Sequence, residues 1–191
     1  MTGVSFSWTE FFGFVTGAAA VWLLAKQKIW NWPVGMANAV FYIVVFMRSG
    51  LYGDAGLQVV YALMNAYGWY NWLRPQRETE LKVRRTPGRD WGWMVPATGI
   101  AAVGLARFLA AYTDSTVPWW DGLTTSLSLV AIYGQSKKFV ESWWIWILAD
   151  LIYIPLYGYK GLWLTSFLYG VFLILCIVGL RAWAGALRVR A

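Results

Sequence analysis

Long apolar stretches, separated by short charged segments, run through the whole of this 191-residue chain. Crossing the hydrocarbon core of a bilayer takes about 20 apolar residues, with a range of about 17–25. Seven stretches approach this length, and only the sixth contains a charged residue, Asp150: Phe11–Ala25, Ile29–Met47, Ala55–Leu73, Trp91–Ala106, Gly122–Ser136, Ser142–Tyr159 and Gly161–Leu180. Flanking Trp, Lys and Arg side chains can extend the shorter ones to the membrane surface. The pattern predicts an all-α membrane protein with seven transmembrane helices.

Composition strengthens the membrane prediction. Hydrophobic residues make up 59% of the chain and charged residues 13%, whereas a soluble domain carries about 25% charged residues. The chain also contains 15 Trp. Trp and Tyr gather at membrane interfaces, and they also line pockets that stack flat ligands. The aromatic content therefore suits both anchoring in lipid and binding an aromatic ligand.

The net charge of +7 is distributed unevenly between the predicted helices. In a soluble protein this charge would indicate a nucleic acid partner. Here the basic residues gather in alternate connecting segments, so we expect no nucleic acid partner. With the N-terminus outside, the inner segments carry 13 Lys and Arg residues and the outer segments carry 3. The positive-inside rule then predicts a bacterial inner-membrane protein with the N-terminus outside and the C-terminus in the cytoplasm.

Residue content excludes several kinds of chemistry. The chain has no His, which removes His-based catalytic triads and His metal sites. Its one cysteine, Cys176, falls in the last apolar stretch and is predicted to be an inert core residue. The sequence has no GxxxxGKS or GxxxxGKT phosphate-binding motif, and no Ser or Thr beside a base in a recognisable motif. We therefore expect neither an enzyme nor an ATP-driven pump, and no metal or cofactor.

The two ends of the chain resemble each other at a fixed offset of 111 residues, without a gap. Nine identities fall within positions 26–72 and their counterparts. The matching pairs are Lys26 and Lys137, Trp32 and Trp143, Tyr42 and Tyr153, Ile43 and Ile154, Gly50 and Gly161, Leu51 and Leu162, Leu57 and Leu168, Gly68 and Gly179, and Trp72 and Trp183. Trp and Gly that recur at one spacing indicate an internal repeat.

Three helices per repeat carry the chain from one side to the other, so a second copy in the same orientation needs one extra crossing. This predicts a 3+1+3 arrangement of parallel repeats. The predicted parts are a first three-helix repeat (1–73), a basic cytoplasmic loop (74–90), a linking helix (91–112) and a second three-helix repeat with a short tail (113–191). Transporters with such repeats bind substrate near the midplane between them. The alternative is a duplicated scaffold without a pathway.

One face of the stretch Ser142–Tyr159 carries the most informative residues. Trp143, Trp146, Asp150 and Tyr153 follow one another at spacings of three and four, which places them within one arc of a helix. An ionisable residue at membrane depth is costly and normally faces a cavity or a partner. Asp150 is therefore predicted to bind substrate; the alternative is a structural acid that pairs with Lys or Arg or caps a helix break. The two tryptophans either stack a ligand or anchor the helix at the membrane surface.

Neutral polar and aromatic residues occupy matching faces of the other predicted helices. Asn and Gln can hydrogen-bond hydroxyls and amides without any charge, and their alternative role is to join helices within lipid. The repeat partner of Asp150 is Ala39, so the predicted pocket is asymmetric and suits an asymmetric ligand. The further candidate binding residues are Trp32, Asn38, Tyr42, Gln58, Tyr61, Asn65, Gln135 and Tyr169.

Several short motifs resemble the PnuC family of vitamin transporters. They are NWPVGMAN (31–38), GLYGDA (50–55), YGWYNW (67–72), ESWWIW (141–146) with Asp150, KGL (160–162) and LY (168–169). The similarity covers nearly the whole chain beyond the first few residues, apart from the loop 74–90. Each motif is short, but their combination in one order is specific.

The resemblance implies a fold related to the SWEET sugar transporters and a homotrimer in the lipid bilayer. It also implies facilitated diffusion (uniport) of nicotinamide riboside, which intracellular phosphorylation then traps. Trp143 and Trp146 match the family's WxxW motif and would stack the pyridinium ring. The resemblance also assigns ribose and carboxamide binding, or the gate, to a set of polar residues: Asn38, Gln58, Asn65, Gln135 and Asp150.

Three functions follow as alternatives. The first is passive transport of nicotinamide riboside, with thiamine or riboflavin as the alternative vitamin, because family members carry these too. Thiamine is also a flat cation, so the aromatic faces do not separate the two. The second is a small-sugar carrier of the SWEET type, for which fewer aromatic residues are expected. The third is a membrane receptor or assembly subunit that transports nothing and docks a partner on the basic loop.

Overall fold

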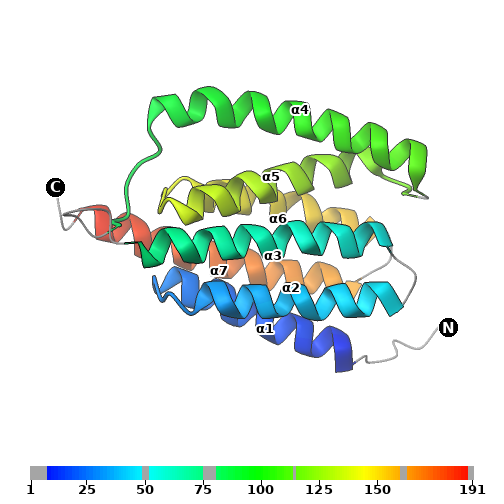
Figure 1. Ribbon diagram of the computed structural model, residues 1–191, viewed down its shortest axis with the longest axis horizontal. Helices are drawn as coiled ribbons and strands as arrows, with labels where there is room; N and C mark the ends of the chain where they lie inside the picture. The colour runs from blue at the N-terminus through cyan, green and yellow to red at the C-terminus, as the bar shows by residue number, and fades with distance from the viewer. Residues whose placement is uncertain (1–7, 49–51, 75–80, 114, 160–162, 189–191) are drawn as a thin grey trace. The chain divides into compact units, whose positions relative to one another are not determined.

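The computed structural model describes residues 8–48, 52–74, 81–113, 115–159 and 163–188. These residues form seven α-helices and no strand, which confirms the all-α, seven-helix prediction (Figure 1). The helices are α1 (Trp8–Ala25), α2 (Asn31–Arg48), α3 (Tyr52–Leu73), α4 (Gly88–Tyr112), α5 (Pro118–Ser136), α6 (Ser142–Tyr159) and α7 (Trp163–Arg188). Two of the repeat identities, Gly50 with Gly161 and Leu51 with Leu162, lie outside the described residues, as does part of the basic loop, 75–80.

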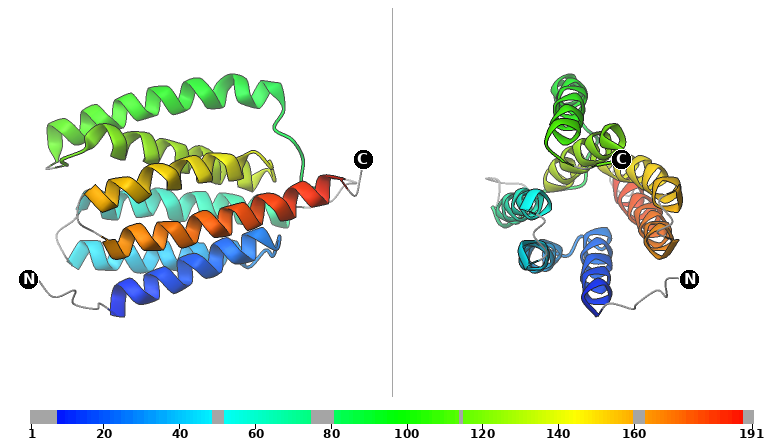
Figure 2. Two further views of the ribbon diagram at one scale, coloured as in Figure 1. Left: turned by 180° about the vertical axis from the view of Figure 1, so that it is seen from behind. Right: turned by 90° about the vertical axis from the view of Figure 1, so that its right-hand side faces the viewer.

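The chain divides into two compact units, Met1–Arg74 and Pro75–Ala191. In the first unit, α2 packs against both α1 and α3. In the second unit, α4, α5, α6 and α7 each pack against the next helix along the chain. The end-on view in Figure 2 shows α4 against α5 and α6 beside α7. Packing in sequence order follows from the short connections between the helices.

Many large apolar side chains point out of the helix packing. Two described helices, Gly88–Tyr112 and Ser166–Arg188, are long and apolar enough to cross a membrane, whereas Phe11–Ala25 and Asn31–Val45 are apolar but shorter. On the two long helices Ile100 is 76% exposed and Phe167 is 68% exposed. A water-facing surface rarely carries so much apolar area, so these faces suit contact with lipid.

The same helix-ending turn occurs at the α1–α2 corner and at the α5–α6 corner. At the first corner the Lys28 N–H donates to the Leu23 carbonyl at 2.9 Å, and at the second the Phe139 N–H donates to the Gly134 carbonyl at 2.8 Å. Each bond spans six residues and defines a Schellman motif. The preceding residue takes the left-handed conformation in both turns, with φ 53° at position 27 and φ 56° at position 138. All of these positions differ by the 111-residue offset.

A matching Trp–Gly–Trp contact joins the last two helices of each three-helix set. Trp32 on α2 meets Trp72 on α3 edge to face, with ring centroids 5.4 Å apart and an interplanar angle of 83°. Trp143 on α6 meets Trp183 on α7 in the same way, at 5.5 Å and 89°. Edge-to-face geometry is favourable for aromatic pairs and adds to the energy of burial. The register of α2 with α3 is therefore the register of α6 with α7.

Glycine on the facing helix makes room for each of these buried rings. A Cβ atom placed on Gly68 would overlap the Trp32 ring, and one placed on Gly179 would overlap the Trp143 ring. Trp32 is 2% exposed and Trp143 is fully buried, so neither ring has space to retreat. The helix backbones can approach closely only because these positions lack a side chain.

We predict that Gly179→Ala destabilises the protein by about 1–3 kcal/mol, because the added methyl group overpacks the Trp143 ring. Gly185→Ala, on the same helix with nothing within 4 Å of the new Cβ, is the matched control. It should be neutral or stabilising by up to about 1 kcal/mol, because alanine favours helix. Thermal unfolding of the purified protein in detergent measures both. Equal melting temperatures for the two variants would contradict the packing role.

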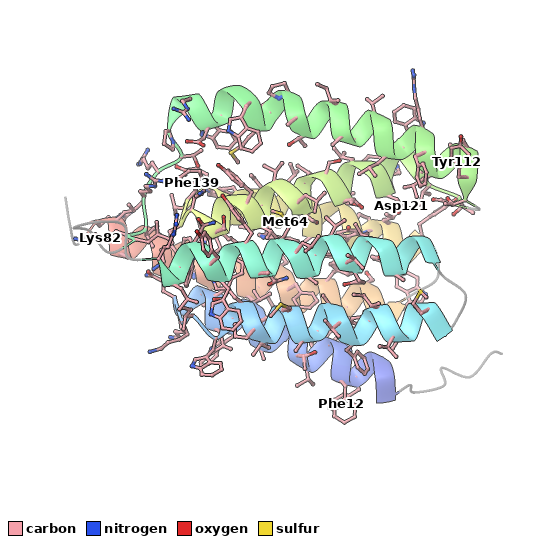
Figure 3. All side chains as sticks on the ribbon, viewed as in Figure 1. Phe12, Met64, Lys82, Tyr112, Asp121 and Phe139 are labelled. Atoms are coloured by element: carbon pink, nitrogen blue, oxygen red, sulfur yellow. The ribbon has the colours of Figure 1, made fainter. Side chains whose placement is uncertain are left out.

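The segment before α4 is fastened to the α5–α6 corner by its backbone. The Arg84 N–H donates to the Lys138 carbonyl at 3.0 Å, and the Val140 N–H donates to the Arg84 carbonyl at 3.0 Å. These two bonds form an isolated parallel bridge between Arg84 and Phe139. Figure 3 shows Phe139 on the corner and Lys82 on the segment that passes it. We call residues 81–87 the strap.

Side chains reinforce the strap. The Glu141 carboxylate accepts hydrogen bonds from the Thr86 N–H and from the Thr86 hydroxyl, each at 2.8 Å. Phe139 is 1% exposed and Val83 is 6% exposed, and the Arg84 guanidinium lies 5.0 Å from the centre of the Phe139 ring. Glu141 directly precedes α6, so the strap fixes the first turn of the helix that carries Trp143, Trp146 and Asp150.

We predict that Glu141→Ala loosens the strap, because two hydrogen bonds to a carboxylate are lost, each worth about 1.5–3 kcal/mol. Hydrogen exchange at the Arg84 and Val140 amides should accelerate by at least about tenfold. Exchange at Lys28, in the corresponding turn of the first unit, serves as the internal control and should not change. Unchanged exchange at Arg84 would show that the carboxylate does not hold the strap.

Candidate functional site

The inner face of α6 carries the acid and two of the predicted aromatic binding residues. Trp143 is fully buried and Asp150 is 2% exposed, whereas Trp144 is 60% exposed on the opposite side. Trp146 and Tyr153 are half-buried. The spacing of three and four residues thus places these predicted site residues on the packed side of the helix, as the sequence pattern indicated.

Asp150 is buried and retains unused hydrogen-bonding capacity. Its Oδ2 atom has no hydrogen-bond partner, and the thiol of Cys176 on α7 is a hydrogen-bonding partner of the carboxyl group. No Lys or Arg in the described part of the chain is seen to pair with it. A carboxylate that is out of contact with water and short of partners is costly, and such groups mark functional sites within membranes.

An aromatic cluster adjoins the acid along α6 and α7. The Tyr153 and Tyr169 ring centroids are 4.5 Å apart, and the Tyr157 and Tyr169 rings stack at 5.1 Å with an interplanar angle of 14°. Phe172 meets Tyr169 edge to face at 5.9 Å. The structure therefore brings together Tyr153 and Tyr169, two predicted site residues that are far apart in the sequence. Tyr157, which shares the predicted α6 face, joins them.

The tryptophans of the two repeats have a packing role in addition to any role in binding. The Trp143 ring packs against Gly179 and Trp183 in the second unit, and the Trp32 ring packs against Gly68 and Trp72 in the first. Yet the indole N–H of each ring is buried without a hydrogen-bond partner. Buried indole N–H groups usually find a partner, so both rings retain a donor that a ligand can use.

Two predicted site residues of α2 face α1 within the first unit. The Asn38 amide donates to the Gly13 carbonyl at 2.9 Å and to the Thr16 hydroxyl at 2.6 Å. The Tyr42 hydroxyl lies directly against Gly13, where a Cβ atom would overlap it. Tyr153, the repeat partner of Tyr42, meets α7 instead, because Thr124 stands at the position that corresponds to Gly13.

The remaining predicted site residues lie on α3 and α5. The Asn65 amide donates to the Tyr61 carbonyl at 2.9 Å, and its oxygen lies against Gly35 of α2. Gln58 and Tyr61 are half-buried, and Gln135 is 4% exposed on α5. Asn65 thus has the helix-joining contacts that were the alternative prediction for such residues. The binding roles of this group stay predictions.

Comparison with known proteins identifies the family. A profile described as nicotinamide mononucleotide transporter matches residues 7–185. The chain belongs to the nicotinamide mononucleotide transporter family. It is therefore a membrane protein of a transporter family, which agrees with the resemblance to PnuC proteins in its short motifs.

Relatives within the family differ in the vitamin that they carry. The nicotinamide riboside transporter PnuC of Escherichia coli (strain K12) is 28% identical over 214 residues, which cover 98% of this chain and 90% of that protein. The riboflavin/roseoflavin transporter RibM of Streptomyces davaonensis is 30% identical over 180 residues, which cover 92% and 84%. A crystal structure of the vitamin B3 transporter PnuC matches this family member with a TM-score of 0.75 and 26% identity, over 97% of this chain and 84% of that one.

Sequence reasoning missed one residue of this site. Cys176 was predicted to be inert, but its thiol contacts Asp150. The repeat itself contained the signal, because the 111-residue offset places Cys176 at the position of Asn65, which was a candidate binding residue. A polar group at one repeat position deserved the same attention at the other.

We predict that Asn38→Ala destabilises the first unit by about 1–3 kcal/mol, because the Gly13 carbonyl and the Thr16 hydroxyl lose a part-buried donor. Thr113→Ala removes one exposed local bond to the Leu109 carbonyl and should stay within about 0.5 kcal/mol. Thermal unfolding in detergent tests both variants. An Asn38→Ala protein as stable as the wild type, but unable to bind substrate, would show instead that this amide serves the ligand.

Proposed function

We propose that this protein carries nicotinamide riboside across the bacterial inner membrane by facilitated diffusion. The observation that carries the proposal is the face shared by α6 and α7, where a buried carboxylate with an unpartnered oxygen adjoins a tyrosine cluster. Family membership and the PnuC relatives support the substrate class. The protein acts as a transporter and not as an enzyme.

The chemistry of this face suits a flat cation that carries hydroxyl groups. A cation over an aromatic ring gains about 0.5–2 kcal/mol, depending on how far both are desolvated. The half-buried Trp146 and the stacked tyrosines offer such rings. The Asp150 carboxylate can accept a hydrogen bond from a ribose hydroxyl or neutralise the pyridinium charge. In this proposal Trp143 and Trp32 contribute through their unpartnered N–H groups.

The proposed architecture is a 3+1+3, SWEET-like pair of parallel three-helix repeats, α1–α3 and α5–α7, linked by α4. The matching Schellman corners and Trp–Gly–Trp contacts support it, because both recur at the 111-residue offset. We further propose that the N-terminus lies outside and the C-terminus in the cytoplasm, from the distribution of Lys and Arg. A homotrimer, the state that the PnuC resemblance implies, completes the proposal.

Riboflavin is the second candidate substrate. The RibM relative is 30% identical and covers 92% of this chain, which is as close a similarity as that of the PnuC relatives. Riboflavin has no pyridinium charge and a larger ring system, so it would depend less on the Asp150 carboxylate and more on ring stacking. The two substrates therefore predict different responses to substitution of Asp150.

We predict that proteoliposomes containing the wild-type protein take up nicotinamide riboside, and that Asp150→Ala and Trp146→Ala each reduce uptake at least about tenfold. That loss corresponds to about 1.4 kcal/mol for each contact with a cation or hydroxyl. Trp144→Ala is the matched control for Trp146→Ala, since it removes an indole from the same helix at a position that is 60% exposed. Its uptake should stay near the wild-type level.

Competition separates the candidate substrates. Unlabelled riboflavin, thiamine or glucose is added in excess to the uptake assay, and only nicotinamide riboside itself should compete fully. Full competition by riboflavin, together with uptake of riboflavin that survives Asp150→Ala, would identify riboflavin as the substrate. Uptake of none of these compounds would refute the transport proposal for this class of substrate.

A further inference from the structure

Cys176 on α7 and Asp150 on α6 form a buried pair of side chains. The thiol is a hydrogen-bonding partner of the carboxyl group, and both residues are almost fully buried, with 4% and 2% of their surfaces exposed. A thiol is a weak donor, but a hydrogen bond to an ionised acceptor is stronger than one between neutral groups. The contact therefore restrains the orientation of the carboxylate.

The second carboxylate oxygen of Asp150 is left over. Oδ2 has no partner in the protein, so the cysteine satisfies only part of the carboxylate. Buried polar atoms without a partner are rare in native proteins, and each one calls for an explanation. A substrate that bears hydroxyl groups provides one, because a hydroxyl can donate to this oxygen.

The repeat places a polar side chain at the same point twice. Cys176 corresponds to Asn65 at the 111-residue offset, and Asp150 corresponds to Ala39. The Asn65 side-chain oxygen lies against Gly35 of α2, which corresponds to Trp146 of α6. In both units this position of the third helix therefore faces the part of the second helix that carries the site residues. Only in the second unit does it meet an acid.

We propose that Cys176 is a positioning residue of the transport site. Its thiol holds one oxygen of Asp150, and this leaves Oδ2 oriented to accept a hydrogen bond from a hydroxyl group of the substrate. The inference rests on the proposed transport of a ribose-bearing vitamin. It assigns Cys176 a role in substrate affinity, whereas a core cysteine would affect stability alone.

Binding of nicotinamide riboside to the purified full-length protein, measured by calorimetry, tests the role. Cys176→Ala should raise the Kd about tenfold, the effect of losing one hydrogen bond to a charged group. Cys176→Ser keeps a donor of similar size and should stay within about threefold of the wild type. In an Asp150→Ala background, Cys176→Ala should have no further effect, because the two residues act through one contact.

Ser166→Ala is the matched control. The Ser166 hydroxyl donates to the Ile154 carbonyl at 2.7 Å, so this variant also removes a hydrogen bond from α7 to α6, but not the one to Asp150. Its Kd should remain at the wild-type value. Equal Kd values for the wild type and Cys176→Ala, or an equal loss in Cys176→Ala and Ser166→Ala, would overturn the positioning role.

Infrared spectroscopy gives a readout that needs no substrate. Because the chain has a single cysteine, its S–H stretching band belongs to Cys176 alone. The band should move to higher frequency in Asp150→Ala, when the acceptor is removed, and an unmoved band would overturn the proposed contact. Failure of the wild type to bind or transport any of the vitamins would refute the proposed function separately, because the infrared result does not depend on it.

Discussion

Each unit of this protein depends on an indole ring that packs against a glycine of the facing helix. The pairs Trp32 with Gly68 and Trp143 with Gly179 leave no room for a Cβ atom. Within lipid the hydrophobic effect gives little drive for helices to associate, so close packing and interhelical hydrogen bonds must supply it. A large flat ring against a bare backbone provides close packing and also fixes the register, because a shift by one residue would remove the glycine. Every other position on these helix pairs is set by that register.

The chemistry of the two units differs although the register is the same. The fixed register places Ala39 and Asn65 near the α2–α3 contact, and it places Asp150 and Cys176 at the corresponding points of α6 and α7. The tyrosines diverge for a steric reason, since the hydroxyl of Tyr42 occupies space over Gly13 that a threonine side chain fills at position 124. Tyr153 turns to α7, where it joins the aromatic cluster beside the acid.

Sequence periodicity was sufficient for the features that repeat along the chain. The uncharged stretches predicted all seven helices, and the 111-residue offset predicted which tryptophans and glycines share an environment. The strap between Thr86 and Glu141 was out of reach, because it joins a polar loop to a helix corner 55 residues away through backbone geometry. The left-handed turns at Gln27 and Lys138 were equally hidden, since such positions are usually signalled by glycine.

The strap gives the second unit a restraint that the first unit lacks at the corresponding place. Glu141, which accepts the two hydrogen bonds from Thr86, corresponds to Trp30, which is 67% exposed and carries no carboxylate. Both corners have the same backbone turn, so the difference arises from this one side chain and its partner. A carrier must hold its binding groups in place while other parts move. The fastened corner leads directly into the helix of Trp146 and Asp150, and this favours the second unit as the part that keeps its geometry during transport.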